Sequence, residues 1–79
     1  MEIEKRLMLS YLKRRYPVHR MKFNNRFKRT IVLENGVFLL SDQASINILT
    51  QSLTQTLKHI FNSDDYLVKD VLKSFLNLT

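Results

Sequence analysis

Residues 30–40 read TIVLENGVFLL, with two runs of large apolar residues on either side of Asn35 and Gly36. An Asn-Gly pair readily supplies the two positive φ angles of a type I′ turn, so this stretch predicts a tight antiparallel hairpin. With Asn35 and Gly36 as the loop, Leu33 is expected opposite Phe38. The hairpin is the clearest local signal in the chain, and the rest of the fold is placed around it.

Both faces of this hairpin are apolar, which is unusual for a small antiparallel sheet. A hairpin with water on one side normally alternates apolar and polar residues. Two arrangements explain the pattern in residues 30–40. Either helices cover both faces, or one face forms an interface with another subunit.

Three helices are expected around the hairpin, over residues 2–16, 43–61 and 64–77, because apolar residues recur there at spacings of three and four. Pro17 ends the first helix, since the residue before a proline is pushed out of the α region. The expected apolar stripe of the first helix consists of Ile3, Leu7, Met8, Tyr11 and Leu12.

The starts of the second and third helices carry capping residues. Ser41 or Asp42 is suited to cap the second helix, and Ser63 to cap the third. Asp64 and Asp65 then fall in the first turn of the third helix, where the helix dipole favours negative charge.

Residues 18–29 are ambiguous in the sequence. Residues 18–23 alternate apolar and polar side chains, as a strand does, and Asn24-Asn25 suggests a turn. The segment is therefore either a short edge strand or a basic loop. The expected fold is α+β: a small antiparallel sheet, one hairpin plus this candidate edge strand, packed with three helices in a single small basic domain, residues 1–79.

The basic residues are concentrated at one end of the chain. Residues 1–29 hold ten of the 13 lysines and arginines against two acidic residues, a net charge of +8. Residues 30–79 hold three basic residues against five acidic ones, a net charge of −2. A segment this basic favours a polyanionic partner, and nucleic acid is the most plausible one.

We therefore expect a non-enzymatic protein, a small regulator that binds DNA or RNA, or a ribonucleoprotein, through its basic N-terminal segment. Cations neutralise phosphates, and aromatic rings stack on bases. Tyr16 and His19 are the candidates for base contacts. The alternative is that the charges only keep the protein soluble and that Phe23 and Phe27 are core residues. The predicted nucleic-acid-binding residues are Lys13, Arg14, Arg15, Tyr16, His19, Arg20, Lys22, Arg26, Lys28 and Arg29.

Composition argues against several other classes. There is no cysteine, only two histidines and a single glycine, so neither a metal site nor a cofactor-binding phosphate loop is expected. No catalytic set of residues stands out. No apolar run approaches the length of a membrane span, and we expect an intracellular, cytoplasmic protein.

Two further partners are open. The first is an acidic protein, such as an enzyme or polymerase subunit, bound by the same basic segment. The second is another copy of the chain, because no ionised side chain occurs from Gln43 to Leu57 and the hairpin is apolar on both faces. A homodimer would bury both surfaces. Attachment of the first helix to an anionic membrane ranks last, since Glu2 and Glu4 oppose it.

Overall fold

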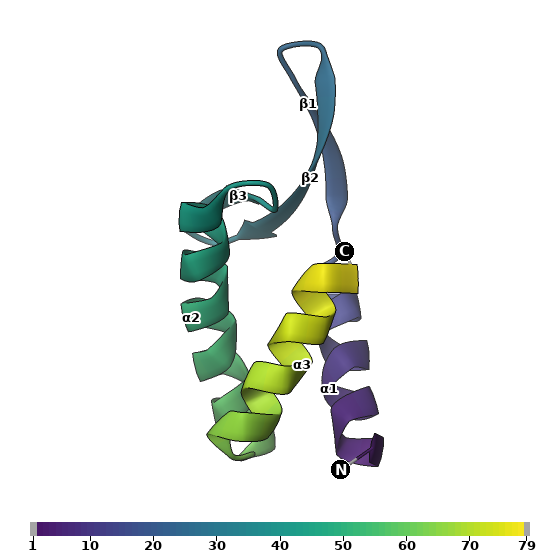
Figure 1. Cartoon of the computed structure of the whole chain (residues 1–79), viewed down its shortest axis with the longest axis vertical. Coiled ribbons are helices and arrows are strands. Elements are labelled where there is room, and N and C mark those ends of the chain that lie inside the picture. The colour runs from purple at the N-terminus through teal and green to yellow at the C-terminus, as the bar shows by residue number, and fades with distance from the viewer. Residues whose placement is uncertain (1, 79) are drawn as a thin grey trace.

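Figure 1 shows the computed structural model, which describes residues 2–78 and the side chains of residues 2–77. The chain forms α1 (Glu2–Arg15), β1 (His19–Phe23), β2 (Arg26–Leu33), β3 (Gly36–Leu39), α2 (Gln43–Phe61) and α3 (Asp65–Leu78). The three helices and the antiparallel sheet, in the order β1-β2-β3, confirm the expected α+β fold. Of the two alternatives for residues 18–29, the strand is the one observed.

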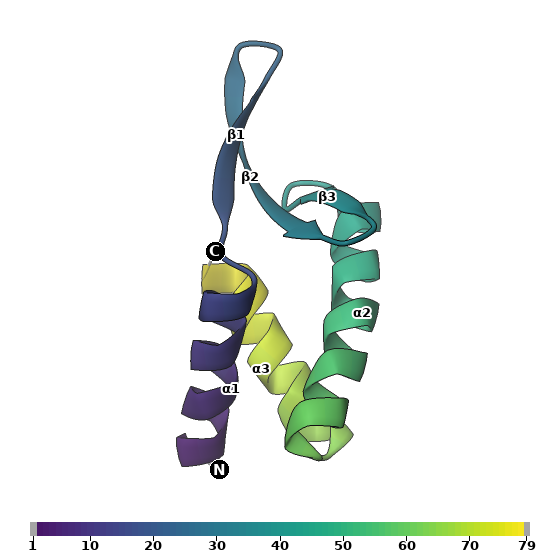
Figure 2. The ribbon, with the colours of Figure 1, turned by 180° about the vertical axis from the view of Figure 1, so that it is seen from behind.

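The three helices pack side by side, with α3 lying between α1 and α2 and contacting both (Figures 1 and 2). β3 and the end of β2 lie across α2 and close one end of this layer. Tyr11 of α1 meets Phe61 of α2 edge to face, with ring centres 5.7 Å apart. The buried core consists of Met8, Leu12, Ile31, Phe38, Leu49, Leu53, Leu57, Val68, Val71, Leu72 and Phe75.

The apolar stripe expected for α1 is only partly correct. Met8 and Leu12 are fully buried, but Ile3 is 73% exposed and Leu7 57% exposed. At 3.6 residues per turn, Leu7 lies about 100° and Ile3 about 140° around the helix from Met8. Because α1 packs mainly on α3, Met8 and Leu12 enter the core and Leu9 and Tyr11 pack against it, whereas Ile3 and Leu7 face away.

Both ends of α2 are fixed by local hydrogen bonds. Asp42 Oδ2 accepts a hydrogen bond from the Ser45 backbone N–H at 3.3 Å, so Asp42 is the N-cap. At the other end Asn62 adopts the left-handed conformation, with φ of 51°, and its N–H donates to the Lys58 carbonyl. This left-handed residue ends the helix and turns the chain back toward α3.

The cap of α3 differs from the expected one. Asp64 Oδ1 accepts a hydrogen bond from the Leu67 backbone N–H at 2.8 Å, so Asp64 rather than Ser63 caps the helix. The Ser63 hydroxyl instead donates to Glu4 Oε2 at 2.7 Å. Ser63 is therefore used to tie the α2–α3 connection to the first turn of α1, a contact that local sequence does not reveal.

Two ion pairs join neighbouring helices at this end of the molecule. Lys5 Nζ lies 2.9 Å from Asp70 Oδ2, and the hydrogen bond to Asp70 raises the pKa of Lys5. Lys58 pairs with Asp65, and this contact holds the pKa of the Asp65 carboxyl below its usual range. Both pairs are partly open to solvent, so they fix orientation more than they add stability.

The register of the second hairpin also differs from the expected one. Leu33 pairs with Gly36 and Ile31 with Phe38, so the loop is Glu34-Asn35. The partner of each residue moves by two positions, which leaves every side chain on its expected face. Pairing Ile31 directly with Phe38 places the two buried apolar residues of the sheet together on the helices, and this packing sets the register.

One face of that hairpin is covered and the other is open. Ile31 is fully buried and Phe38 nearly so, whereas Val32 is 43% and Val37 47% exposed. Val32 and Val37 are direct cross-strand partners. Helices of this chain therefore do not cover both faces, which excludes the first of the two arrangements considered above.

Substitutions at two neighbouring positions of α2 test this core. We expect Leu49→Ala to lower the free energy of unfolding by about 2–5 kcal/mol, because it leaves a cavity at a fully buried site. Ile48→Ala, at a 44% exposed position on the same helix, should change it by less than about 1 kcal/mol. Urea unfolding followed by circular dichroism measures both. Equal losses would contradict the placement of α2.

Candidate functional site

Residues 19–29 form a two-stranded ribbon that stands clear of the helices, and we call this ribbon the arm (Figures 1 and 2). It consists of β1, the Asn24-Asn25 turn and the first half of β2. The arm makes the molecule long and narrow, 42 Å by 19 Å by 19 Å. Within it only Met21 and Lys28 are half-buried, and every other residue is exposed.

The turn at the tip explains why this basic segment is ordered as strands. Asn24 and Asn25 have φ angles of 50° and 67°, so both central residues occupy the left-handed region of a type I′ turn. Asparagine tolerates this region better than most residues because its side chain bonds locally. The type I′ turn expected at Asn35-Gly36 is thus found at the other hairpin.

The base of the arm is anchored in the fold by Thr30. Its side chain is fully buried, and its hydroxyl donates to the His19 carbonyl at 2.9 Å. Thr30 pairs with His19 on one side and with Leu39 of β3 on the other. The direction in which the arm leaves the helices is therefore held by strand pairing on both sides of β2.

The strand register divides the arm into two faces, because directly paired residues share a face. On the first, Arg20 lies opposite Arg29 and Lys22 opposite Phe27. All four are exposed, and Phe27 is 63% exposed. We call this set the open face.

The second face of the arm is more closely packed. Met21 lies opposite Lys28, and both are half-buried. Phe23, opposite Arg26, is only 37% exposed. The aliphatic stem of a lysine can cover an apolar neighbour while its ammonium stays in water. We call this the covered face; it also carries His19, which is exposed at the base.

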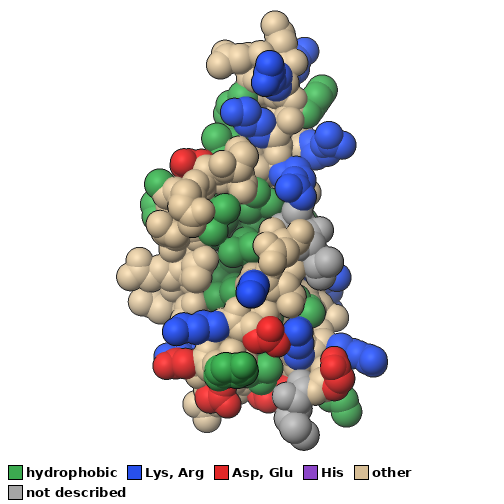
Figure 3. Space-filling view, viewed as in Figure 1, with side chains coloured by type: hydrophobic (Ala, Val, Ile, Leu, Met, Phe, Trp, Pro, Cys, Tyr) green, Lys and Arg blue, Asp and Glu red, His purple; other side chains and the backbone are tan. Residues whose placement is uncertain are grey.

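The end of α1 adds cations at the base of the arm. Lys13, Arg14 and Arg15 occupy the last turn of α1 and are exposed, and only Tyr16, Pro17 and Val18 separate them from β1. The structure thus brings all ten sequence-predicted residues into one region, which runs from the last turn of α1 to the tip of the arm. Figure 3 shows blue side chains along this narrow end.

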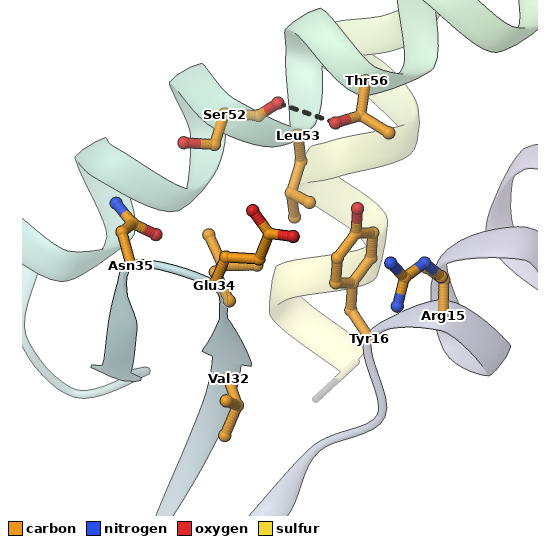
Figure 4. Close-up of a pocket in the computed structure, with 9 residues that line it drawn as sticks. Arg15, Tyr16, Val32, Glu34, Asn35, Ser52, Leu53 and Thr56 are labelled. Carbon is orange, nitrogen blue, oxygen red and sulfur yellow. Dashed lines mark hydrogen bonds between the residues drawn. The ribbon is translucent and has the colours of Figure 1, made fainter.

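A cleft of about 390 Å³ lies beside this junction, between the end of α1, the Glu34-Asn35 loop and α2 (Figure 4). Tyr16 is half-buried and faces the cleft, with the guanidinium carbon of Arg15 5.4 Å from the centre of its ring. Such a cation–π contact holds Arg15 in place. Of the two residues predicted to contact bases, His19 is thus the exposed one and Tyr16 is partly enclosed.

Acidic residues gather at the opposite end of the molecule. Glu4, Asp64, Asp65 and Asp70 line one depression there, and Figure 3 shows red side chains at that end. Among residues 2–78, the ion pairs involve Lys5 and Lys58, and no arm cation has a carboxylate within 4.0 Å. The arm therefore presents uncompensated positive charge at one end of a dipolar molecule.

Comparison of the chain with protein-family models, with curated proteins and with solved structures gives no match. Within the described residues, no three metal-ligating side chains lie close enough together to hold an ion. No helix in that part of the chain has the length and apolarity to cross a bilayer.

Phe27 is an exposed residue of the open face that was not among the sequence-predicted contacts. Its exposure follows from the register, in which it pairs with Lys22 and stands on the open face. The signal in the sequence was the Asn24-Asn25 pair. Placing a type I′ turn there fixes Phe27 opposite Lys22 and on the side of Arg20 and Arg29.

The open face predicts a measurable internal repulsion. Like charges directly opposite each other destabilise a strand pair, and salt screens the effect. Arg20→Thr removes the repulsion from Arg29, so at low ionic strength we expect amide hydrogen exchange in the arm to slow by about two- to five-fold. Lys22→Thr, which faces Phe27 instead, is the matched control. The proposed repulsion is refuted if the two variants behave alike or if salt leaves the difference unchanged.

Proposed function

We propose that this protein binds nucleic acid without catalysing a reaction, and that the arm and the end of α1 form the binding surface. The observation that carries the proposal is the arm itself. It bears five lysines and arginines and no acidic residue, and it extends away from the helices where a large partner can reach it. Exposed cations with no carboxylate partner are suited to neutralising phosphates.

The shape of the arm supports the same proposal. A ribbon of five residue pairs is about 16 Å long at about 3.3 Å per residue. Two-stranded ribbons are one of the elements that proteins place against nucleic acids. The acidic end lies at the other extreme of the long axis, so repulsion from a polyanion orients the molecule with the arm toward it.

The contacts divide between two groups of residues. Arg20, Lys22, Arg26, Lys28 and Arg29 provide the phosphate contacts along the arm, and Lys13, Arg14 and Arg15 extend them at its base. His19 is exposed between the two groups and remains a candidate for a base contact. Tyr16 faces the cleft beside Arg15, so it contacts a nucleotide that enters the cleft. A small basic protein of this kind fits a regulatory role.

The proposal is tested by removing charge from the arm and, separately, the same charge from the helices. Replacing Arg20, Arg26 and Arg29 by glutamine should weaken binding strongly. It should also reduce, by about 2–3, the magnitude of the slope of the logarithm of the association constant against the logarithm of salt concentration. Replacing Arg6, Lys69 and Lys73, which are exposed on α1 and α3, changes net charge equally but should leave most of the binding intact.

Fluorescence anisotropy with labelled single- and double-stranded DNA and RNA, over a salt series, measures both variants against the wild type. If the two triple variants lose binding equally, net charge alone is responsible and the arm is not the site. If the wild type fails to bind at about 50 mM salt, the nucleic-acid proposal is rejected.

A second candidate function is a protein contact, which the exposed Val32–Val37 pair favours. β3 is an edge strand that contacts α2, and α2 carries exposed uncharged residues such as Gln51 and Gln55. An edge strand that carries an exposed apolar side chain, as β3 does at Val37, suits addition of a strand from a partner. The partner is either an acidic protein that also engages the arm, or a second copy of the chain in a homodimer.

Light scattering distinguishes these two partners. We expect a homodimer to give twice the monomer mass at micromolar concentration, and Val37→Lys to return it to the monomer by placing a charge in the interface. Ile48→Lys, at a similarly exposed position on α2, is the control. A monomer at all concentrations would contradict self-association and leave the acidic partner as the protein contact to seek.

A further inference from the structure

Phe27 occupies a position that phosphate binding does not explain. It lies on the open face, directly opposite Lys22 and one residue pair along the face from Arg20 and Arg29, and 63% of it is exposed. A large aromatic ring in water is unfavourable. Phe23 shows the contrast, because it belongs to the covered face and is 37% exposed.

The neighbours of Phe27 identify the chemistry of its partner. Arg20, Lys22 and Arg29 carry positive charge on the same face, and in residues 2–78 no carboxylate lies within 4.0 Å of them. Side chains two residues apart on a strand are separated by about 6.6 Å. The face therefore presents an apolar ring among three anion-binding groups, so its partner combines flat apolar surfaces with closely spaced negative charges.

We propose that the open face binds single-stranded nucleic acid, with Phe27 stacking on an unpaired base while Arg20, Lys22 and Arg29 contact the neighbouring phosphates. This inference rests on the function proposed above and names its substrate class. In a duplex, the faces of the bases are occupied by stacking, and a groove offers a phenyl ring only polar base edges and the occasional methyl group. In a single strand, every base has a free face, whatever its identity.

The test compares Phe27→Ala with Phe23→Ala on four probes: a 12-nucleotide thymidine strand, the uridine strand of equal length, a 12-base-pair DNA duplex, and the thymidine strand with its central bases removed. Phe27→Ala should weaken binding to both intact strands by about 5- to 100-fold. It should change duplex binding by less than two-fold. Phe23→Ala, on the covered face, should change none of these affinities appreciably.

The strand without central bases isolates the stacking contact. Removing the central bases should weaken binding of the wild type by the same factor as Phe27→Ala weakens binding to the intact strand. The wild type and Phe27→Ala should then bind the strand without central bases equally, because the stacking contact is absent from both complexes. Unchanged far-UV circular dichroism and urea midpoint show that the variant is folded, as expected for an exposed position.

The remaining outcomes overturn the inference in distinguishable ways. If Phe27→Ala binds single strands as the wild type does while the arm triple variant does not, stacking is wrong and nucleic-acid binding stands. If no probe binds the wild type, both proposals fail. Vesicles containing phosphatidylserine form a fifth probe: a loss on Phe27→Ala there, with strand binding unchanged, assigns Phe27 to a membrane contact and refutes this inference.

Discussion

The structure depends on a single strand, β2, whose two halves lie in different environments. The second half of β2 pairs with β3 and places Ile31 in the helical core, where it is fully buried. The first half, Arg26–Arg29, pairs only with β1 and touches no helix extensively. An isolated two-stranded hairpin is marginally stable in water. The arm is ordered because its strand continues into a strand that the core already holds.

This arrangement separates the stability of the protein from its surface chemistry. The buried apolar side chains come from the helices and from Ile31 and Phe38, and none comes from the arm. Charges on the arm therefore face water in the free protein and carry little desolvation cost. The strand pairing anchored at Thr30 holds these like charges close together despite their mutual repulsion. A surface with this much uncompensated charge gains favourable interactions when an anion replaces the water.

The helices of this protein were predictable from sequence because they depend on local signals. Apolar spacing, Pro17 and Asp42 define the boundaries of α1 and α2 to within a residue. The exposure of Ile3 and Leu7 was not predictable, since it depends on which row of α1 meets α3. The Ser63–Glu4 hydrogen bond joins residues 59 positions apart, and no local pattern encodes it.

The candidate site was predictable in composition but not in arrangement. The charge count identifies the cations, and the alternation of residues 18–23 is compatible with a strand. The register of the arm follows from the turn conformation of Asn24 and Asn25, which the sequence signals less strongly than it signals an Asn-Gly turn. At the second hairpin, packing outweighed the Asn-Gly signal, because pairing Ile31 with Phe38 places the loop at Glu34-Asn35.

The two faces of the arm limit how a polyanion can use its charges. Arg20, Lys22 and Arg29 share the open face, whereas Arg26 and Lys28 point to the other side of the ribbon. One unbent strand lying on the open face reaches the first three and not the last two. A partner that engages all five must surround the ribbon, as the walls of a groove or a folded-back strand do. The salt dependence of binding reports the number of phosphates neutralised. That number therefore shows whether the partner lies on one face of the arm or surrounds it, as well as how charge contributes to affinity.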